Sequence, residues 1–255
     1  MLNKKPTYRV AVVGATGAVG QEMIEVLEER KFPVETLLPL ASSRSAGGIV
    51  SFQGKDLVIR ELTKDSFNGI DIALFSAGAD VSREYAPIAA KAGAVVIDNS
   101  SAWRMDKDVP LVVPEVNLGD LAQHQGIIAN PNCSTIHLVL ALKPIQDTFG
   151  IEQGIVTTLQ AASGAGYPGV PSLDLIDNVI PYISGEEEKI ESESRKILGR
   201  WADGRFEDAP LTLSAHCNRV PVRDGHMETV SLKLAQPAPP EEIARVLAEF
   251  RARPQ

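Results

Sequence analysis

The sequence predicts an α/β fold in which a doubly wound parallel sheet is followed by an α+β domain. In the first half, short apolar runs such as Tyr8–Val13 alternate with helix-like stretches such as 20–30. Nearly continuous apolar strands separated by helices are typical of a parallel sheet that is covered on both faces. In the second half, Gly, Ala, Ser and Pro become frequent and strand-like alternation replaces the continuous apolar runs. This change of pattern predicts a second domain of mixed architecture.

Length and composition limit the classes of protein that fit. The chain has 255 residues, and at ~150 residues per domain this is about two domains. We place them at 1–132 and 133–255. The formal net charge of −8 argues against nucleic-acid binding, which needs clustered Lys and Arg. Two cysteines, no signal peptide and no membrane-length apolar run predict a soluble, cytoplasmic protein with no membrane partner.

The expected elements follow from the positions of the apolar residues. In the first domain we expect strands at 8–13, 36–40, 71–76 and 94–98 and helices at 20–30 and 81–92. In the second domain we expect a helix at 136–142, a strand at 155–159 and a helix after the acidic run 186–188. Strands at 220–222 and 229–235 of a half-exposed antiparallel sheet complete the prediction, together with a final helix at 240–251.

A glycine-rich loop lies between the first strand and the first helix. It reads GATGAVG over residues 14–20 and has the spacing GxxGxxG. Small residues allow a pyrophosphate to approach the backbone, and the N-terminus of the following helix favours negative charge. The alternative is a simple tight turn, but the position between strand and helix favours a dinucleotide-binding loop.

The loop after the second strand bears on cofactor choice. It contains Ser42, Ser43, Arg44 and Ser45, where an NAD site usually has an acidic residue for the ribose. Hydroxyls and a guanidinium suit a 2′-phosphate, because Arg can bind it through two hydrogen bonds. A solvated polar loop is the alternative. We predict NADP rather than NAD as the cofactor.

Cys133 is the candidate nucleophile. It follows Asn132 and precedes the apolar residues 136–142, so it lies in or beside the first turn of a helix that Asn can cap. The helix dipole and the N–H groups of that turn favour a thiolate. A buried thiol without reactivity is the alternative, and this is the interpretation we give to Cys217.

Among the four histidines, His226 is the candidate acid or base. It lies in a turn that contains Gly225 and is flanked by strand signals, and histidine titrates near neutral pH. His137 lies on an apolar helix and is expected to be structural. A metal site built from Cys133, Cys217 and histidines is disfavoured, because no pair has a ligand spacing such as CxxC. We therefore expect no metal.

The ordered motifs GATGAVG, SSRSAG, DNSSAWRMD, NPNCST, QAASGAG and HCNRVPVRDGH resemble those of bacterial aspartate-β-semialdehyde dehydrogenases. The resemblance extends from about Tyr8 to the last residue. Relatives of this kind continue past the equivalent of Gln255, so we expect the second domain to be C-terminally incomplete. Position 227 is Met, where many relatives have a small residue.

The resemblance implies a role for each matching position. Cys133 matches the nucleophile, Gln160 the glutamine that orients the substrate at the thiol, and His226 the acid/base. The residues that match substrate-binding positions are Arg104 and Lys189 for phosphate, Arg219 for the α-carboxylate, Glu186 for the amino group, and Asn132. The residues that match cofactor-binding positions are Gly14, Thr16, Gly17, Ala18, Val19, Gly20, Ser42, Ser43, Arg44, Ser45, Ser76, Ser163 and Gly164.

The implied activity is the NADPH-dependent reductive dephosphorylation of aspartyl-4-phosphate to aspartate-4-semialdehyde through a cysteine thioester. The product serves the biosynthesis of lysine, methionine, threonine and diaminopimelate, and the implied assembly is a homodimer or homotetramer.

An alternative is N-acetyl-γ-glutamyl-phosphate reductase, which has a similar cofactor loop and also has a cysteine and a histidine at its active site. Arg219, seven residues before His226, argues against it. A second alternative is an inactive chain that binds only NADP or a partner subunit.

Overall fold

The computed structural model describes residues 4–202 and 204–253. The chain forms two compact units. The first runs to Pro110 and includes Ala122–Asn130, and the second consists of Leu111–Leu121 and the chain from Pro131 onward. The grouping of Leu111–Leu121 with the second unit has no counterpart in the sequence pattern.

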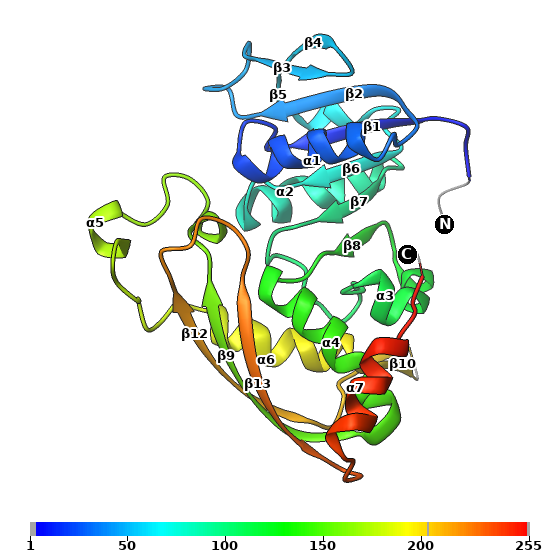
Figure 1. The fold of residues 1–255 in the computed structure, drawn as a ribbon. Coiled ribbons are helices and arrows are strands. Elements are labelled where there is room, and N and C mark those ends of the chain that lie inside the picture. Colours follow the sequence, from blue (N-terminus) through cyan, green and yellow to red (C-terminus); the bar gives the residue numbers. More distant parts are fainter. Residues whose placement is uncertain (1–3, 203, 254–255) are drawn as a thin grey trace. The chain divides into compact units, whose positions relative to one another are not determined.

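The first unit is built on a six-stranded sheet in which every neighbouring pair is parallel (Figure 1). Its strands, in spatial order, are β5 (Arg60–Glu61), β2 (Val34–Ala41), β1 (Tyr8–Val13), β6 (Ile72–Phe75), β7 (Val95–Asp98) and β8 (Ile127–Ala129). Its helices are α1 (Ala18–Glu29), α2 (Ala79–Lys91) and the 3-10 helix Lys64–Phe67. The predicted parallel sheet is confirmed, and α1 begins two residues earlier than expected.

Both faces of this sheet are covered, which explains the continuous apolar run of β1. Val10 and Val12 pack with Ile24 of α1 in one buried cluster. Ala11 and Val13 belong to a second cluster, which includes Ala86 and Ala89 of α2 together with other residues. Because successive side chains of a strand point to opposite faces, a strand between two helical layers needs an apolar residue at every position.

A β-hairpin beside the sheet was not predicted. It consists of β3 (Ile49–Phe52) and β4 (Lys55–Val58), which pair antiparallel. Its two turn residues, Gln53 and Gly54, both have positive φ, at 50° and 71°. Two-residue hairpin turns need this backbone conformation, which Asn-Gly adopts most readily. Gln at the first position obscures the usual sequence signal.

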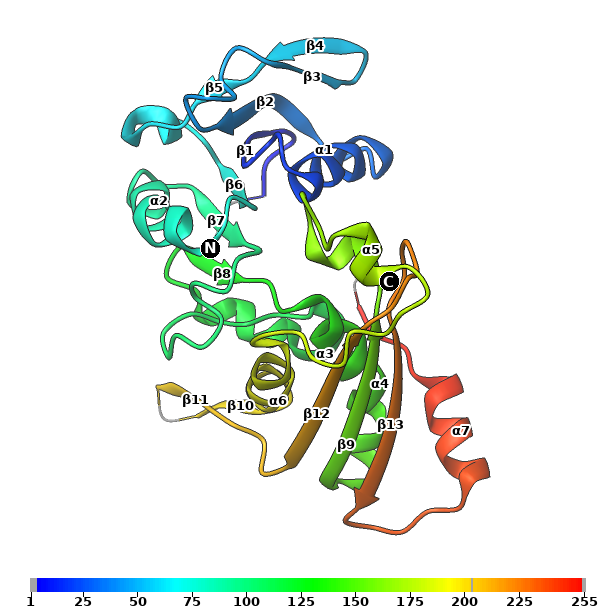
Figure 2. The same cartoon turned by 90° about the vertical axis from the view of Figure 1, so that its left-hand side faces the viewer.

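The second unit contains a three-stranded sheet flanked by helices (Figure 2). The spatial order is β12 (Thr212–Arg219), β9 (Ile151–Gln160) and β13 (Met227–Leu234). The helices are α3 (Pro114–Asn117), α4 (Cys133–Phe149), α5 (Ser172–Leu175), α6 (Glu186–Ile197) and α7 (Pro240–Glu249), with a 3-10 helix at Ala162–Ala165. A further 3-10 helix, Leu118–Gln123, begins in this unit, and its last two residues belong to the first unit. A small hairpin joins β10 (Arg200–Ala202) to β11 (Arg205–Glu207).

The predicted strand at 220–222 is wrong, and the sheet is only partly antiparallel. The strand lies earlier, at Thr212–Arg219, and it pairs parallel with β9, whereas β13 pairs antiparallel with β9. Pro221 has no N–H and cannot extend the ladder. The carbonyls of Val222 and Arg223 instead accept hydrogen bonds from the N–H groups of Ala162 and Ser163. The segment 220–223 therefore fixes the loop that follows β9.

The core of the second unit lies between this sheet and its helices. Leu138, Leu142 and Phe149 of α4 pack against Val156 of β9 and Ile190 of α6. Helix α4 is longer than predicted and runs through Pro144 to Phe149. In the described part of the chain, no helix is long and apolar enough to cross a membrane.

Candidate active site

The nucleophile candidate Cys133 is the first residue of α4, as the sequence predicts. Asn132 caps the helix, because its side-chain Oδ1 accepts hydrogen bonds from the N–H groups of Ser134 and Thr135 at 3.0 and 3.4 Å. The thiol of Cys133 is exposed. Its position at a helix N-terminus favours the thiolate through the dipole and the N–H groups of the first turn.

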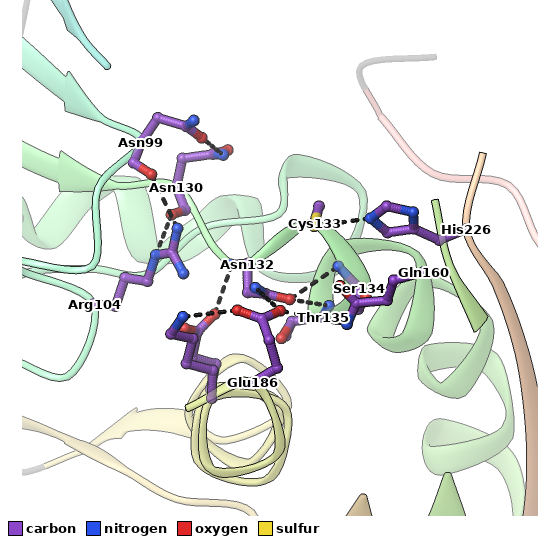
Figure 3. A network of polar contacts seen from close by, with 12 residues as sticks. Asn99, Arg104, Asn130, Asn132, Cys133, Ser134, Thr135, Gln160, Glu186 and His226 are labelled. Atoms are coloured by element: carbon purple, nitrogen blue, oxygen red, sulfur yellow. Dashed lines mark hydrogen bonds and ion pairs between the residues drawn. The ribbon is translucent and has the colours of Figure 1, made fainter. Parts of the chain in front are cut away.

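His226 lies directly beside this sulfur. The Nε2 atom of His226 is 3.2 Å from Sγ of Cys133 (Figure 3). The other ring nitrogen, Nδ1, accepts a hydrogen bond from the N–H of Ala161 at 3.0 Å. Since Nδ1 accepts, the proton of the neutral ring must lie on Nε2. Nε2–H therefore donates toward Sγ, and a thiolate is its best acceptor.

Charge and burial keep this histidine neutral. Burial lowers the pKa of His226, and the positive charges of His137 and Arg219 lower it further, against a smaller opposite effect of Glu186. The direction agrees with the hydrogen bond from Ala161, which would be lost if Nδ1 were protonated. Both observations indicate a neutral imidazole at physiological pH.

The end of the three-stranded sheet supplies two further candidates. In the sheet register Arg219 of β12 pairs with Gln160 of β9, and β13 begins one residue after His226. Both Arg219 and Gln160 are buried. Arg219 donates from Nη1 to the carbonyl of Ala161 at 2.6 Å. Ala161 therefore orients both Arg219, through its carbonyl, and His226, through its N–H.

Glu186 connects the helix cap to α6. One carboxylate oxygen accepts from Lys189 at 2.7 Å, and the other accepts from Asn132 at 2.7 Å and from Gln160 at 3.4 Å (Figure 3). Burial raises the pKa of Glu186, but the hydrogen bonds from Lys189 and Asn132 outweigh it, and the net pKa is below its usual value. Glu186 is therefore ionised and holds the side-chain amides of both Asn132 and Gln160.

The 3-10 helix Ala162–Ala165 contains the predicted cofactor residues Ser163 and Gly164. A side-chain carbon at Gly164 would lie 2.9 Å from Nη1 of Arg219 and 3.0 Å from Cε1 of His226. The contact with Arg219 is closer than real Cβ atoms make and the contact with His226 is tight, so a side chain at this position would shift the ends of these two side chains. The glycine therefore lets Arg219 and His226 keep their observed positions.

Arg104 lies in the first unit, where backbone carbonyls hold its guanidinium. Nε donates to the carbonyl of Asn130 at 3.0 Å, and Nη2 donates to the carbonyl of Asn99 at 2.9 Å. The two asparagine side chains are also joined, at 2.7 Å (Figure 3). Arg104 is buried and rigidly placed, and its partner Asn130 lies three positions before Cys133 in the sequence.

The glycine loop of the first unit fits a bound pyrophosphate. Gly14 has φ +90°, and a side chain at Gly20 would lie 2.1 Å from the carbonyl oxygen of Gly14, so α1 begins in close contact with the loop. Gly17 is the N-cap of α1, no side chain among the described residues caps this helix, and its first turn has no acidic residue. The N–H groups there and the helix dipole suit an anionic group.

The other cofactor candidates of the first unit surround this loop. Thr16, Ala18 and Val19 are at least partly exposed at the start of α1. Ser76 follows β6 and donates from Oγ to the carbonyl of Val13 at 3.1 Å. The loop after β2 is closed by backbone hydrogen bonds from Ser45 and Ala46 to Ser42. Its exposed residues are Ser42, Ser43 and Arg44, with Ser45 half-buried.

Two residues of the site were not predicted from the sequence. Glu193 of α6 accepts a hydrogen bond from the N–H of Asn132 at 2.7 Å, and Ala161 holds Arg219 and His226 as described above. Both form hydrogen bonds with residues more than fifty positions away in the sequence, and Ala161 does so with its backbone groups. Among the described residues, no group of three or more His, Cys, Asp or Glu is arranged to hold a metal ion.

Two family models match the chain. Residues 9–124 match the semialdehyde dehydrogenase NAD binding domain, and residues 142–255 match the semialdehyde dehydrogenase dimerisation domain. Together they cover most of the chain and correspond to its two predicted functions, cofactor binding and assembly.

Curated relatives and solved structures agree with these models. The chain is 47% identical to an aspartate-semialdehyde dehydrogenase of Aquifex aeolicus and 44% identical to one of Bacillus subtilis, over 94% of this chain and 78% of each relative. It is also similar to the crystal structure of Vibrio cholerae aspartate semialdehyde dehydrogenase II complexed with ASA, with a TM-score of 0.88, 41% identity and coverage of 96% and 80% of the two chains. The corresponding Candida albicans structure with NADP gives a TM-score of 0.83 at 38% identity, over 96% and 77%.

The two cysteines should differ in reactivity. Burial raises the pKa of Cys217 to about 11, so only about one part in ten thousand is thiolate at pH 7. We expect iodoacetamide to label Cys133 about a hundred-fold faster than Cys217 or more, as measured by mass spectrometry after brief exposure. The unfolded chain is the control, in which both thiols should react alike. Equal labelling of the folded chain would contradict the assignment of Cys133.

Proposed function

The chain belongs to the semialdehyde dehydrogenase family and is an aspartate-semialdehyde dehydrogenase, and from this we propose that it converts aspartyl-4-phosphate to aspartate-4-semialdehyde through a thioester on Cys133. The observation that carries the proposal is the 3.2 Å contact between Sγ of Cys133 and Nε2 of His226 at the start of α4. An exposed thiol at a helix N-terminus beside a neutral histidine has the arrangement of an activated cysteine nucleophile.

The first step is an acyl transfer to sulfur. The thiolate of Cys133 attacks the C4 carbonyl of aspartyl-4-phosphate, an S–C bond forms, and the C–O bond to phosphate breaks. Before the attack, Nε2–H of His226 donates to the thiolate and holds it in place. The product of the step is a thioester on Cys133 and free phosphate.

The second step reduces the thioester. NADPH, when bound, supplies the hydride that converts the thioester to a thiohemiacetal. Nε2–H of the neutral His226 donates a hydrogen bond to the oxygen that becomes negative and stabilises it, until the C–S bond breaks and releases the aldehyde and the thiolate of Cys133. The lowered pKa of His226 keeps the ring neutral, so Nε2 retains its proton for this hydrogen bond.

Charged residues of the site suit a small substrate with several charges. Arg219 has the guanidinium that a carboxylate binds through two hydrogen bonds, and Glu186 is an ionised partner for an ammonium group. Lys189 and Arg104 are each a candidate for binding phosphate, as the resemblance implies. Gln160 and Asn132, both held by Glu186, orient the reacting carbonyl at Cys133.

The cofactor we propose is NADP rather than NAD. The pyrophosphate binds the loop between Gly14 and Gly20, and the 2′-phosphate binds Arg44 with the neighbouring serines. Support comes from the exposed loop after β2 and from the absence of an acidic residue in 41–47. The solved relative from Candida albicans with NADP is consistent with this choice.

The assembly we propose is a homodimer formed through the outer face of the second sheet. Ile155, in the middle of the central strand β9, is 63% exposed, and its neighbours in the register are Ser214 and Ser231. An apolar side chain in the centre of an uncovered sheet face indicates an interaction surface. The matched dimerisation domain includes all three strands.

The product supplies the synthesis of lysine, methionine, threonine and diaminopimelate. This place in metabolism follows from the proposed substrate and product. The activity assay described next tests it.

The activity can be measured in the reverse direction. With aspartate semialdehyde and phosphate or arsenate, we expect the chain to reduce NADP. The absorbance of the reduced nicotinamide measures the rate. Cys133→Ser should lower kcat by about a thousand-fold or more and leave NADP binding intact, whereas Cys217→Ala should retain activity. Absence of turnover by the unaltered chain, or full activity of Cys133→Ser, would refute the proposed mechanism.

Cofactor preference depends on Arg44. One set of charge-assisted hydrogen bonds contributes about 1.5–3 kcal/mol, or roughly ten- to a hundred-fold in affinity. We expect Arg44→Glu to weaken NADP binding by this factor and to leave NAD binding nearly unchanged, as measured by fluorescence titration. Arg30→Glu is the matched control. It makes the same charge change at the C-terminal end of α1, whereas the glycine loop lies at the N-terminal end of that helix. Similar dissociation constants for NADP in both variants would argue against Arg44.

Dimer formation depends on Ile155. We expect the chain to elute at about twice its 27.4 kDa mass in size-exclusion chromatography with light scattering. Ile155→Lys places a charge in the proposed interface and should produce monomers. Val58→Lys is the control, since Val58 is similarly exposed, at 60%, on the hairpin of the first unit. A dimer that persists in Ile155→Lys would exclude this face.

A further inference from the structure

A second pair of ionisable side chains lies directly behind the Cys133–His226 pair. His137 is four residues after Cys133 on α4, and Glu228 is two residues after His226 at the start of β13. Residues four apart on a helix, and residues two apart on a strand, lie on the same face. The helix and the strand therefore place His137 against Glu228 in the same way that they place Cys133 against His226.

The contacts of His137 identify its protonation state. Its Nδ1 lies 3.0 Å from the carbonyl oxygen of Cys133, and a carbonyl can only accept, so Nδ1 carries a proton. Its Nε2 lies 3.1 Å from a carboxylate oxygen of Glu228, which also attracts a proton. Nearly all of the Glu228 side chain is buried, and within the described residues neither its carboxylate oxygens nor Nε2 of His137 make a hydrogen bond of regular geometry, so the 3.1 Å contact is an ion pair. A buried carboxylate needs a positive partner, and the imidazolium of His137 meets that need.

The two histidines thus have opposite surroundings. Their ring centroids are 6.3 Å apart. His226 accepts an N–H at Nδ1 and is neutral, whereas His137 donates to a carbonyl and contacts a carboxylate. The contact with the Glu228 carboxylate raises the pKa of His137 despite its partial burial, and the charge of His137 is among the causes that lower the pKa of His226.

We propose that His137 and Glu228 are a positioning pair, in which Glu228 holds His137 as an imidazolium one helical turn behind the nucleophile. The bond from Nδ1 to the Cys133 carbonyl fixes the first turn of α4, and the positive charge favours both the thiolate of Cys133 and the neutral form of His226. The inference rests on the proposed roles of Cys133 and His226. It replaces the structural role that the sequence predicts for His137.

The charges around the pair come from every neighbouring element. Helix α4 contributes Cys133 and His137, β13 contributes Glu228, β12 contributes Arg219 and α6 contributes Glu186. On α7, which also packs against α4, Arg245 forms ion pairs with Glu242 and Glu249. Arg219 lowers the pKa of His226 in the same direction as His137, so removal of His137 alone should shift this pKa only in part.

The central test is a histidine titration by NMR in the unaltered chain, His137→Gln and Glu228→Gln. In the unaltered chain we expect His137 to titrate above pH 6.5 and His226 below it. In both variants the midpoint of His226 should rise by about 0.5–1 pH unit, the effect of one charge about 6 Å away in a water-like surrounding. His124→Gln is the control. It removes a histidine that belongs to the first unit and should leave the titration midpoint of His226 unchanged.

Reactivity and kinetics add readouts that a merely structural role would not move. The pH midpoint for iodoacetamide labelling of Cys133 should rise in His137→Gln, and His137→Lys, which keeps a positive charge, should restore part of the shift. The acid limb of kcat/KM should move to higher pH in His137→Gln, with a smaller effect on KM.

The outcomes separate the two proposals. If His137 titrates at or below pH 6.5 in the unaltered chain, or if His226 is unaffected in a folded His137→Gln, the positioning pair is refuted. The titration of the unaltered chain remains decisive even if Glu228→Gln fails to fold. If both histidines behave as expected but aspartate semialdehyde is not turned over, the proposed function fails and the pair stands.

Discussion

The hydrogen bonds of Asn132 fix the geometry on which the site depends. Its side-chain oxygen caps α4, its side-chain N–H donates to Glu186, and its backbone N–H donates to Glu193. One residue thus joins the start of α4 to two buried carboxylates of α6. Because an N-cap contributes about 1 kcal/mol and charge-assisted bonds more, the position of Cys133 is determined by α6 as much as by its own helix.

The second constraint is the end of the three-stranded sheet. Parallel pairing of β12 with β9 places Arg219 beside Gln160, and the antiparallel β13 begins next to His226. Ala161 then completes the arrangement with one backbone carbonyl and one backbone N–H. A regular sheet edge and the loop that follows it therefore set the directions of side chains that come from two distant parts of the sequence. This arrangement holds Nε2 of His226 3.2 Å from Sγ of Cys133.

Local patterns in the sequence predict the elements that depend on local physics. The apolar run of β1, the glycine loop before α1 and the Asn cap before Cys133 all appear as expected, because each reflects burial or backbone geometry within a few residues. The strand at 220–222 was wrong because Val-Pro-Val alternates like a strand, while Pro221 cannot donate to a ladder. The bonds that join Glu193 to Asn132 and Ala161 to His226 connect residues more than sixty positions apart, and no local pattern encodes them. The hydrophobic position of His137 on α4 likewise concealed its contact with Glu228.

The contrast between the two cysteines also determines how the site responds to oxidants. Oxidation to a sulfenic acid proceeds through the thiolate, so it should concentrate on the exposed Cys133. Within a protein, a sulfenic acid can form a protective disulfide only when a second thiol can reach it. Cys217 is the only other cysteine of these 255 residues, it is fully buried, and its pKa of about 11 leaves it protonated. Recovery of an oxidised Cys133 therefore requires a thiol from solution, and without one the next oxidation step to the sulfinic acid is irreversible for this chain.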